Sequence, residues 1–263
     1  MWGATRTVVI LLALGGVARG EIAGDRFERR VLAVSGVSEG DCTRHQVWLD
    51  AAADGILTRH LAAGSSAEIE ADDTAEAERL AAEIHAFLHR AALRGKYLAS
   101  ASDIGAALDG GAFNCAATSA LFLALAERTG LPAQAVAVPG HVWVRVELGK
   151  RTLDIETTCP NWFELLERYA GLSNEQVSPA MADHRSRVKK GRVLKRPEFL
   201  AIFCYNRGVG LIRQGDFSAA VLANLQAVTL DPRCTVAWQN LWRAAGDSCL
   251  QMTGQAQVAQ QGN

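Results

Sequence analysis

The chain has 263 residues, of which 49% are apolar and 21% are charged. This balance is typical of a globular protein and excludes a largely disordered chain, and the length suffices for one sizeable domain plus a smaller one. The formal net charge is −1, so the composition gives no sign of bulk binding to nucleic acid or to a membrane surface.

The first twenty residues differ from the rest. Arg6 precedes an apolar run at 8–14, and the small residues Ala18 and Gly20 end the segment. This pattern predicts a cleavable secretory signal at 1–20, with a mature chain that begins near Glu21. No later stretch is long and apolar enough to cross a bilayer. We therefore expect an exported protein, periplasmic or extracellular, without stable membrane insertion after signal cleavage.

Residues 21 to about 100 are expected to be helical. Apolar residues recur at helical intervals over 43–62 and 75–94, and a cap region at 72–74 precedes the second stretch. His85 and His89 share one helix face there, at a spacing that can bind a metal. No cysteine or carboxylate completes a known metal-binding pattern, so we expect a solvated or partly packed face. The sequence implies no metal and no cofactor.

Cys115 begins a stretch with apolar residues at helical spacing. Asn114 can cap the start of this helix, and Gly130 with Pro132 supplies its end. At a helix N-terminus the dipole favours a thiolate, and free backbone N–H groups can face an oxyanion. The sequence therefore predicts a buried helix that carries a reactive thiol at its mouth, with the N–H of Cys115 as one oxyanion donor and no second donor identified.

Three β-strands are expected next. Residues 135–138 form the first, 142–148 alternate between apolar and polar residues, and 151–156 follow a turn at Gly149. Consecutive strands joined by short turns pair in antiparallel fashion. The pattern therefore predicts an antiparallel sheet beside the cysteine-bearing helix.

An imidazole and two carboxylates lie on these strands. His141 opens the second strand, and Asp154 and Glu156 are two residues apart on the third, so both project from one face. Pairing of the two strands places one of these acids beside the imidazole, where it can fix the tautomer and orientation of the ring. A thiol at Cys115, an imidazole and a carboxylate are the components of a cysteine acyl-transfer site.

From roughly Tyr97 to Thr158 the chain resembles the transglutaminase-like superfamily. The resemblance lies in the cysteine at the head of a helix that ends in Gly-Leu-Pro at 130–132, in His-Val-Trp-Val-Arg-Val at 141–146, and in Glu-Thr-Thr at 156–158. The family usually has an aspartate just before the threonine. Alignment on Thr158 gives that position to Glu156, which we favour as the third member, with Asp154 as the rival.

This resemblance implies an α+β fold with a papain-like core, in which the cysteine-bearing helix packs on an antiparallel sheet. Members of the superfamily include acyl-transfer cross-linkers, cysteine peptidases, amidases and inactive scaffolds. The resemblance therefore implies a reaction type on protein or peptide amides, and it does not choose between water and an amine as the acceptor.

Two further segments follow. Residues 183–197 are rich in arginine and lysine without aromatic residues, and we interpret them as a solvated basic linker rather than a nucleic-acid site. Residues 198–253 resemble a tetratricopeptide repeat, with Gly208, a turn at 214–217 and Pro232 at the repeat's spacing. Fewer than three repeats do not form a free-standing solenoid, so we expect this part to dock on the preceding domain or on a partner protein.

The predicted organisation is thus a signal at 1–20, a transglutaminase-like domain with a helical N-terminal part at 21–182, the basic linker, the helical repeat and a flexible tail at 254–263. Six cysteines occur, and in an oxidising compartment some can pair, but the spacing assigns no bridge. Two functions follow. One is a thiol-dependent hydrolase or acyltransferase, and the other is an inactive scaffold that binds a partner through the helical repeat.

Overall fold

The computed structural model describes residues 26–62 and 74–261, with side chains described as far as residue 251. The predicted signal at 1–20 and the expected helix break at 63–66 lie outside the described residues. Within the described part of the chain, no helix combines the length and apolar character that a membrane crossing requires.

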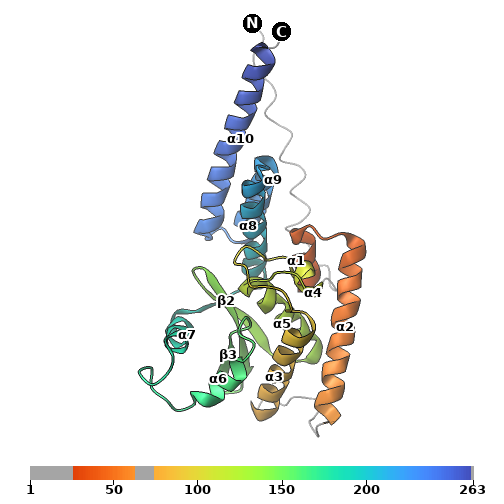
Figure 1. The fold of residues 1–263 in the computed structure, drawn as a ribbon, viewed down its shortest axis with the longest axis vertical. Coiled ribbons are helices and arrows are strands. Elements are labelled where there is room, and N and C mark those ends of the chain that lie inside the picture. The colour runs from red at the N-terminus through yellow and green to blue at the C-terminus, as the bar shows by residue number, and fades with distance from the viewer. Residues whose placement is uncertain (1–25, 63–73, 262–263) are drawn as a thin grey trace.

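The protein is a mixed α+β structure in which helices predominate (Figure 1). The described residues form these elements: α1 (Phe27–Ser35), α2 (Glu39–Ala62), α3 (Thr74–Ala91), α4 (Ile104–Leu108), α5 (Cys115–Thr129), β1 (Ala133–Val138), β2 (His141–Leu148), β3 (Arg151–Ile155), α6 (Trp162–Arg168), α7 (Pro179–Lys190), β4 (Arg192–Val193), α8 (Arg196–Gln214), α9 (Phe217–Leu230) and α10 (Thr235–Gln261).

The four strands form one antiparallel sheet in the order β3-β2-β1-β4. The two faces of β2 differ because side chains alternate along a strand. Val142, Val144 and Val146 are buried in the core together with apolar residues of α5. His141 and Trp143 project from the opposite face, where Trp143 contacts α7. Helix α5 therefore covers one face of the sheet, and α7 lies against the other.

The three predicted strands, and the helix predicted from Cys115, are all present. Helix α5 ends where expected, because Gly130 adopts a left-handed conformation with φ of 74° and its N–H bonds to the carbonyl of Ala126. A buried ion pair fixes the C-terminal part of α5, with 2.7 Å between the guanidinium of Arg128 and the carboxylate of Glu28 in α1. Both partners are almost fully buried, so the pair anchors α5 within the helical layer.

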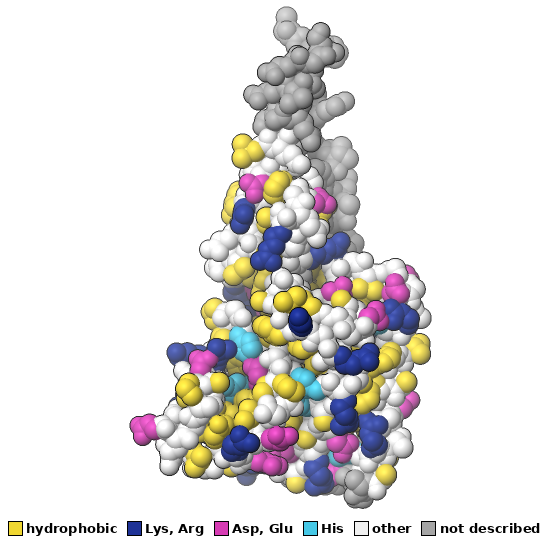
Figure 2. Space-filling view, in the orientation of Figure 1, with side chains coloured by type: hydrophobic (Ala, Val, Ile, Leu, Met, Phe, Trp, Pro, Cys, Tyr) yellow, Lys and Arg dark blue, Asp and Glu magenta, His cyan; other side chains and the backbone are white. Residues whose placement is uncertain are grey.

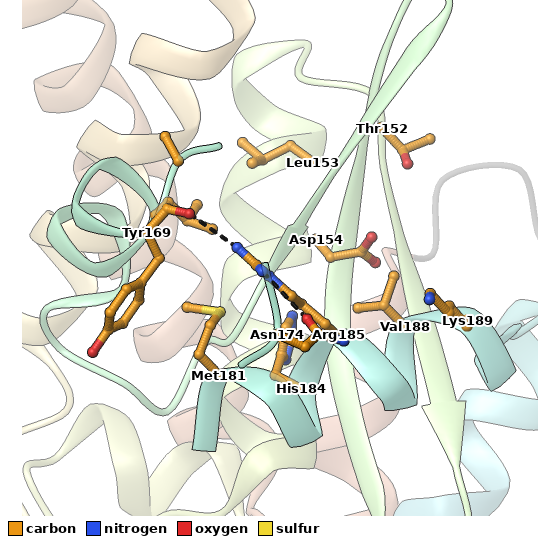
Figure 3. A pocket seen from close by; sticks show the side chains of 12 residues that line it. Thr152, Leu153, Asp154, Tyr169, Asn174, Met181, His184, Arg185, Val188 and Lys189 are labelled. Carbon is orange, nitrogen blue, oxygen red and sulfur yellow. Dashed lines mark hydrogen bonds between the residues drawn. The ribbon is translucent and has the colours of Figure 1, made fainter. Parts of the chain in front are cut away.

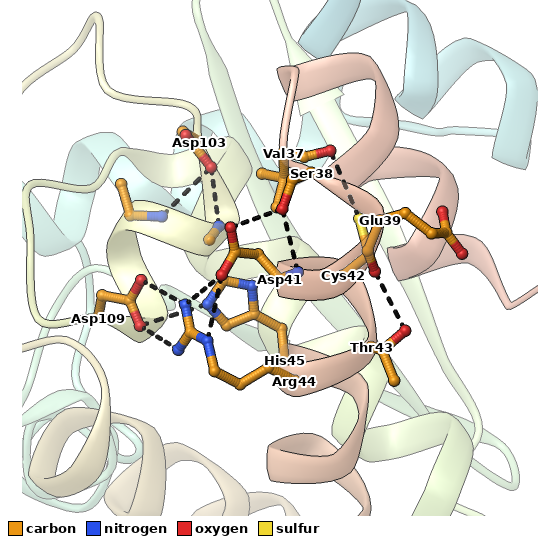
Figure 4. Close-up of polar contacts among 12 residues, drawn as sticks. Val37, Ser38, Glu39, Asp41, Cys42, Thr43, Arg44, His45, Asp103 and Asp109 are labelled. Carbon is orange, nitrogen blue, oxygen red and sulfur yellow. Dashed lines mark hydrogen bonds and ion pairs between the residues drawn. The ribbon is translucent and has the colours of Figure 1, made fainter.

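Polar contacts join α2 to the short helix α4, which leads into the loop before Cys115 (Figure 4). The guanidinium of Arg44 donates to both carboxylate oxygens of Asp109, at 2.8 and 3.1 Å. Asp103 caps α4 by accepting from the backbone N–H groups of Gly105 and Ala106. The loop that precedes the cysteine thus leaves a helix that is anchored at both ends.

Helices α8, α9 and α10 stack above the body of the molecule (Figure 1). Gly208 of α8 permits a close approach of α9, because a Cβ atom at this position would lie 2.2 Å from Nδ2 of the buried Asn224. The rings of Phe199 in α8 and Phe27 in α1 stack at 5.4 Å and join this unit to the body. Helices α8 and α9 are joined at the turn that the sequence indicated at 214–217, and α10 begins at Thr235.

Residues 183–197 do not form the plain linker that their basic composition suggested. They contain the end of α7, strand β4 and the start of α8, and β4 pairs with β1 as the edge of the sheet. Two features tie the segment to the fold: His184 is buried, and a Cβ atom at Gly191 would lie 2.5 Å from the ring of Trp143. Helix α10 also continues through 261, whereas a flexible tail was expected from 254.

Candidate functional site

Cys115 is the first residue of α5, and the residue before it organises the helix start. The side-chain oxygen of Asn114 accepts the N–H of Ala117 at 3.0 Å, and its amide nitrogen donates to the carbonyl of Ala99 at 3.0 Å. The first N–H groups of any helix lack partners within the helix. The N–H of Cys115 is therefore free to face a bound oxygen, and 9% of the surface of the residue is exposed.

His141 pairs with Glu156, and Cys115 lies next to the same ring. The Nε2 atom of His141 is 2.5 Å from a carboxylate oxygen of Glu156, and both side chains are about 15% exposed. Burial disfavours the imidazolium, but hydrogen bonding and charge from Cys115 and Glu156 outweigh it and raise the pKa of His141 to about 9. At neutral pH the imidazole is therefore protonated, next to a thiol and a carboxylate.

Glu156 follows the last residue of β3 and is held from the opposite side by Thr158. The Thr158 hydroxyl and backbone N–H donate to one carboxylate oxygen at 2.7 and 3.4 Å, which leaves the other oxygen for His141. Burial opposes the charge of Glu156, yet the contact with His141 and the two bonds from Thr158 keep the pKa of Glu156 below its ordinary value. Glu156 is thus an ionised carboxylate that orients the imidazole.

Asp154, the rival acid, is bound elsewhere. Its carboxylate accepts from Nε1 of Trp143 at 2.6 Å and from two nitrogens of Arg145 at 2.9 and 3.1 Å. Arg145 lies directly opposite Asp154 in the β2–β3 register, which explains the two-pronged pair. In the structure Cys115, His141 and Glu156 therefore lie together. Asp154 instead accepts hydrogen bonds from Trp143 and Arg145.

Thr157 connects the acid to the cysteine helix, a link that the sequence did not predict. Its buried hydroxyl lies 2.7 Å from that of Thr118 and 3.1 Å from that of Ser119, one turn after Cys115. Its carbonyl oxygen is 3.1 Å from Nε2 of His89 in α3. The residue next to Glu156 is therefore bound to the helix that carries the thiol, and the spacing between acid and thiol is fixed.

The two histidines of α3 lie beside this loop, and His89 contacts the carbonyl of Thr157. His85 is 3% exposed, and burial lowers its pKa to about 4, so its ring is neutral. The rings of His85 and His89 lie 4.6 Å apart, and His85 also meets the ring of Phe163. Across the part of the chain that the structure describes, no three potential metal ligands gather. The helix face that carries His85 and His89 was expected to be solvated or partly packed, and at His85 it is buried.

Tyr97 is a further site residue that the sequence did not single out. Residues 95–99 run alongside 111–114 at a separation that only glycine permits, since a Cβ atom at Gly95 would lie 2.0 Å from the carbonyl oxygen of Gly111. The N–H of Leu98 bonds to the carbonyl of Phe113 at 2.9 Å, and Tyr97 forms a parallel bridge with Phe113, two residues before the cysteine.

The phenol of Tyr97 faces the thiol. Partial burial raises the pKa of Tyr97, and so do the charges of Cys115 and Glu156 and a hydrogen bond with Cys115. About half of the Tyr97 surface is exposed, so the ring lies at the edge of the site. When the sulfur attacks a carbonyl, the oxyanion that forms needs hydrogen-bond donors close to the sulfur. The hydroxyl of Tyr97 is such a donor.

Each cysteine is a free thiol in the structure, including Cys115. Cys42 and Cys204 are buried, and burial raises the pKa of Cys204 to about 12, which makes this thiol unreactive. Figure 2 shows histidine side chains at the surface of the body, next to acidic and hydrophobic side chains.

Comparisons with protein-family models, with curated proteins and with solved structures find no match for this chain. The geometry of the site therefore carries the functional argument.

Proposed function

We propose that the protein is a transglutaminase-like cysteine enzyme that hydrolyses protein or peptide amides or transfers their acyl group to an amine. The contact that carries this proposal is His141 between Glu156 and Cys115, in a setting that keeps the imidazole protonated. The position of the thiol at the start of a helix and of the imidazole on an antiparallel sheet supports the same proposal.

The reaction begins with the sulfur of Cys115, whose proton passes to the imidazole of His141, so that sulfur and imidazolium form the reactive pair. The sulfur attacks the amide carbonyl, a carbon–sulfur bond forms, and the carbonyl π electrons move to oxygen. His141 then gives its proton to the leaving nitrogen as the carbon–nitrogen bond breaks, which leaves a thioester on Cys115 and a neutral imidazole. Glu156 stays ionised and holds the ring in place.

The second half returns the site to its starting state. The neutral imidazole of His141 takes a proton from water or from an amine as that molecule attacks the thioester, and the thiolate leaves. Water yields a carboxylic acid, whereas an amine yields a new amide. In both halves the developing oxyanion lies between the N–H of Cys115 and the hydroxyl of Tyr97, which supplies the second donor.

Two reagents separate the parts of this mechanism. Iodoacetamide alkylates a thiolate without forming an oxyanion, whereas a p-nitrophenyl ester acylates it through one. We expect His141→Ala to slow both reactions at Cys115. We expect Tyr97→Phe to leave alkylation unchanged and to slow acylation by about 10-fold to 100-fold, somewhat less than the loss of a fully buried oxyanion donor. Thr58→Val is the control for loss of a hydroxyl, because Thr58 is an exposed residue of α2 whose hydroxyl donates to the carbonyl of Asp54.

Mass spectrometry of the Cys115 peptide reports both reactions despite the other cysteines. Acylation and alkylation that proceed at the same rate with and without His141 would overturn the enzyme proposal. If Tyr97→Phe and the native protein are acylated at the same rate, Tyr97 is not an oxyanion donor, and the roles of Cys115 and His141 are unaffected.

A scaffold is the second candidate, and the surface of α10 favours it. Trp238 and Trp242 lie four residues apart on one helix face and expose 39% and 72% of their surfaces. Exposed aromatic residues on a repeat-type helix suit an apolar helix of a partner protein. This function predicts that Trp242→Ala abolishes partner binding while His141→Ala does not affect it, and the reverse pattern would contradict it.

A further inference from the structure

A cavity of about 490 Å³ lies between β3, α6 and α7, on the side of the sheet away from α5. Its size is within the range of small-ligand sites. Leu166, Met181 and Val188 give it apolar walls, and Ala170 lies at its rim. Figure 3 shows α7 on one side of the cavity and Asp154 of β3 on the other.

The polar groups of this cavity are mostly bound already, which fixes its shape. Arg185 donates to the carbonyl oxygens of Leu172 and Tyr169 at 2.8 and 3.0 Å and to the side chain of Asn174 at 3.3 Å. These bonds hold the segment after α6 that closes one end of the cavity (Figure 3). Asp154 is held by Trp143 and Arg145. The cavity is therefore preformed, and its main open surface is apolar.

His184 connects the cavity to the candidate active site. It is more than nine-tenths buried, forms no hydrogen bond with any described residue, and meets the ring of Trp143 at 6.2 Å. Trp143 in turn stacks on His141 at 6.0 Å. The rings of His141 and His184 are thus no more than about 12 Å apart. An extended chain covers this distance in about three or four residues.

The edge of the sheet also faces this cavity. In the described sheet β3 pairs on one side only, with β2. The carbonyl of Asp154 points outward, because it accepts from Nε1 of Trp162 at 3.0 Å. Along an antiparallel pair, residues whose backbone groups face the partner strand alternate with residues whose backbone groups face away from it. Thr152 lies two residues before Asp154, so its N–H and carbonyl point outward as well. Both are free to pair with an added strand.

We propose that this cavity binds an extended segment of the peptide substrate, three or four residues from the reacting amide. The substrate main chain pairs with the outward-facing backbone of Thr152, and one bulky apolar side chain enters the cavity. The exposed Lys189 at the rim favours an acidic residue beside that side chain. The proposal rests on the acyl-transfer function proposed above, and it assigns that function a substrate class.

The probes are nine-residue peptides whose central side chain is an electrophilic glutamine analogue. Leucine, phenylalanine or glycine is placed at each flanking position in turn, and the rate of Cys115 modification is measured. We expect leucine to accelerate modification about tenfold at a position three or four residues from the centre, the effect of burying one apolar side chain.

Two variants change the cavity in opposite directions. Ala170→Phe adds a ring at the rim and is expected to abolish the preference for leucine, and Leu166→Ala enlarges the cavity and shifts the preference toward phenylalanine. Ala51→Phe, at an exposed position on α2, is the matched control and keeps the native preference. A peptide series without any preferred position, or a preference that persists unchanged in both cavity variants, would overturn the proposal.

Iodoacetamide distinguishes this outcome from a failure of the active site. The rate at which iodoacetamide alkylates Cys115 does not depend on the cavity. We therefore expect the native alkylation rate in both Ala170→Phe and Leu166→Ala. An iodoacetamide rate that is the same with and without His141 would count against the acyl-transfer function itself, whatever the peptide preference.

Discussion

The hydroxyl of Thr157 lies 2.7 Å from the hydroxyl of Thr118, and this buried contact joins the loop that carries the acid to the helix that carries the thiol. Thr157 comes directly after Glu156, and Thr118 is one turn after Cys115. The distance between the thiol of Cys115 and the carboxylate of Glu156, which lie on separate elements, is thereby set by their neighbours in sequence. An active site that depends on this spacing needs such a support.

The first prediction concerns this link. Thr157→Val removes the hydroxyl that Thr118 and Ser119 share, and it leaves buried polar groups without a partner. We expect the free energy of unfolding to fall by about 1–3 kcal/mol, measured by urea denaturation. Thr152→Val, at an exposed position of β3, is the control and should change stability little. A loss no larger than that of the control would show that the link is dispensable.

The second prediction separates the two acids. Glu156→Gln removes the carboxylate that holds the imidazolium, so the pKa of His141 should fall from about 9 towards its ordinary value. Asp154→Asn weakens the hold on Arg145 and should leave the pKa of His141 nearly unchanged. Nuclear magnetic resonance titration of the His141 ring measures both variants. The opposite pattern would make Asp154 the functional acid.

The third prediction concerns acid stability. His85 is neutral in the folded protein because burial lowers its pKa to about 4, whereas an unfolded histidine has a pKa near 6.5. The unfolded state therefore binds more protons between these values, and His85 causes stability to be lost as the pH falls from 6.5 to 4. The loss should amount to about 3 kcal/mol at pH 4.

His85→Phe provides the test, since a phenylalanine ring keeps the contact with Phe163 and does not titrate. Urea denaturation at pH 4, 5.5 and 7 should show a smaller dependence on pH in this variant than in the native protein. An identical dependence in the two proteins would rule out His85 as the source of the acid sensitivity.

The fourth prediction compares two glycines of α8. Gly208→Ala places a Cβ atom against the side chain of Asn224, which is buried and bonded to the carbonyl of Ala220, so the two helices must separate. We expect a loss of about 1–3 kcal/mol in the free energy of unfolding. Gly210→Ala meets no atom within 4 Å and should stabilise the helix by about 0.5–1 kcal/mol. Equal effects of the two substitutions on thermal unfolding would contradict the proposed close approach.

The sequence predicted the local parts of the site because their signals are local. Alternation along 142–148 identified β2, and the glycine–proline pair after Thr129 identified the end of α5. Tyr97 gave no such signal, because its place beside Cys115 depends on the close contact between Gly95 and Gly111. The choice of Glu156 over Asp154 rested on alignment with a threonine, and the structure adds a physical reason, since Arg145 lies directly across from Asp154.

The basic segment at 183–197 shows the limit of composition as a guide. Its arginines and lysines suggested a solvated linker, yet Gly191 packs on Trp143 and β4 completes the sheet. A two-residue strand is too short to produce a visible alternation, and a helix that buries only Met181 and His184 has a weak apolar face. Tertiary contacts, rather than local propensity, fix this part of the chain.

The most direct test of the central claim is the rate of Cys115 alkylation by iodoacetamide as a function of pH, in the native protein and in His141→Ala. The native profile should show a step near pH 9, where His141 loses its proton, and the rate at pH 7 should exceed that of the variant at least tenfold. The profile of His141→Ala should lack the step that belongs to His141. Superimposable profiles for the two proteins would contradict the claim that His141 activates the thiol.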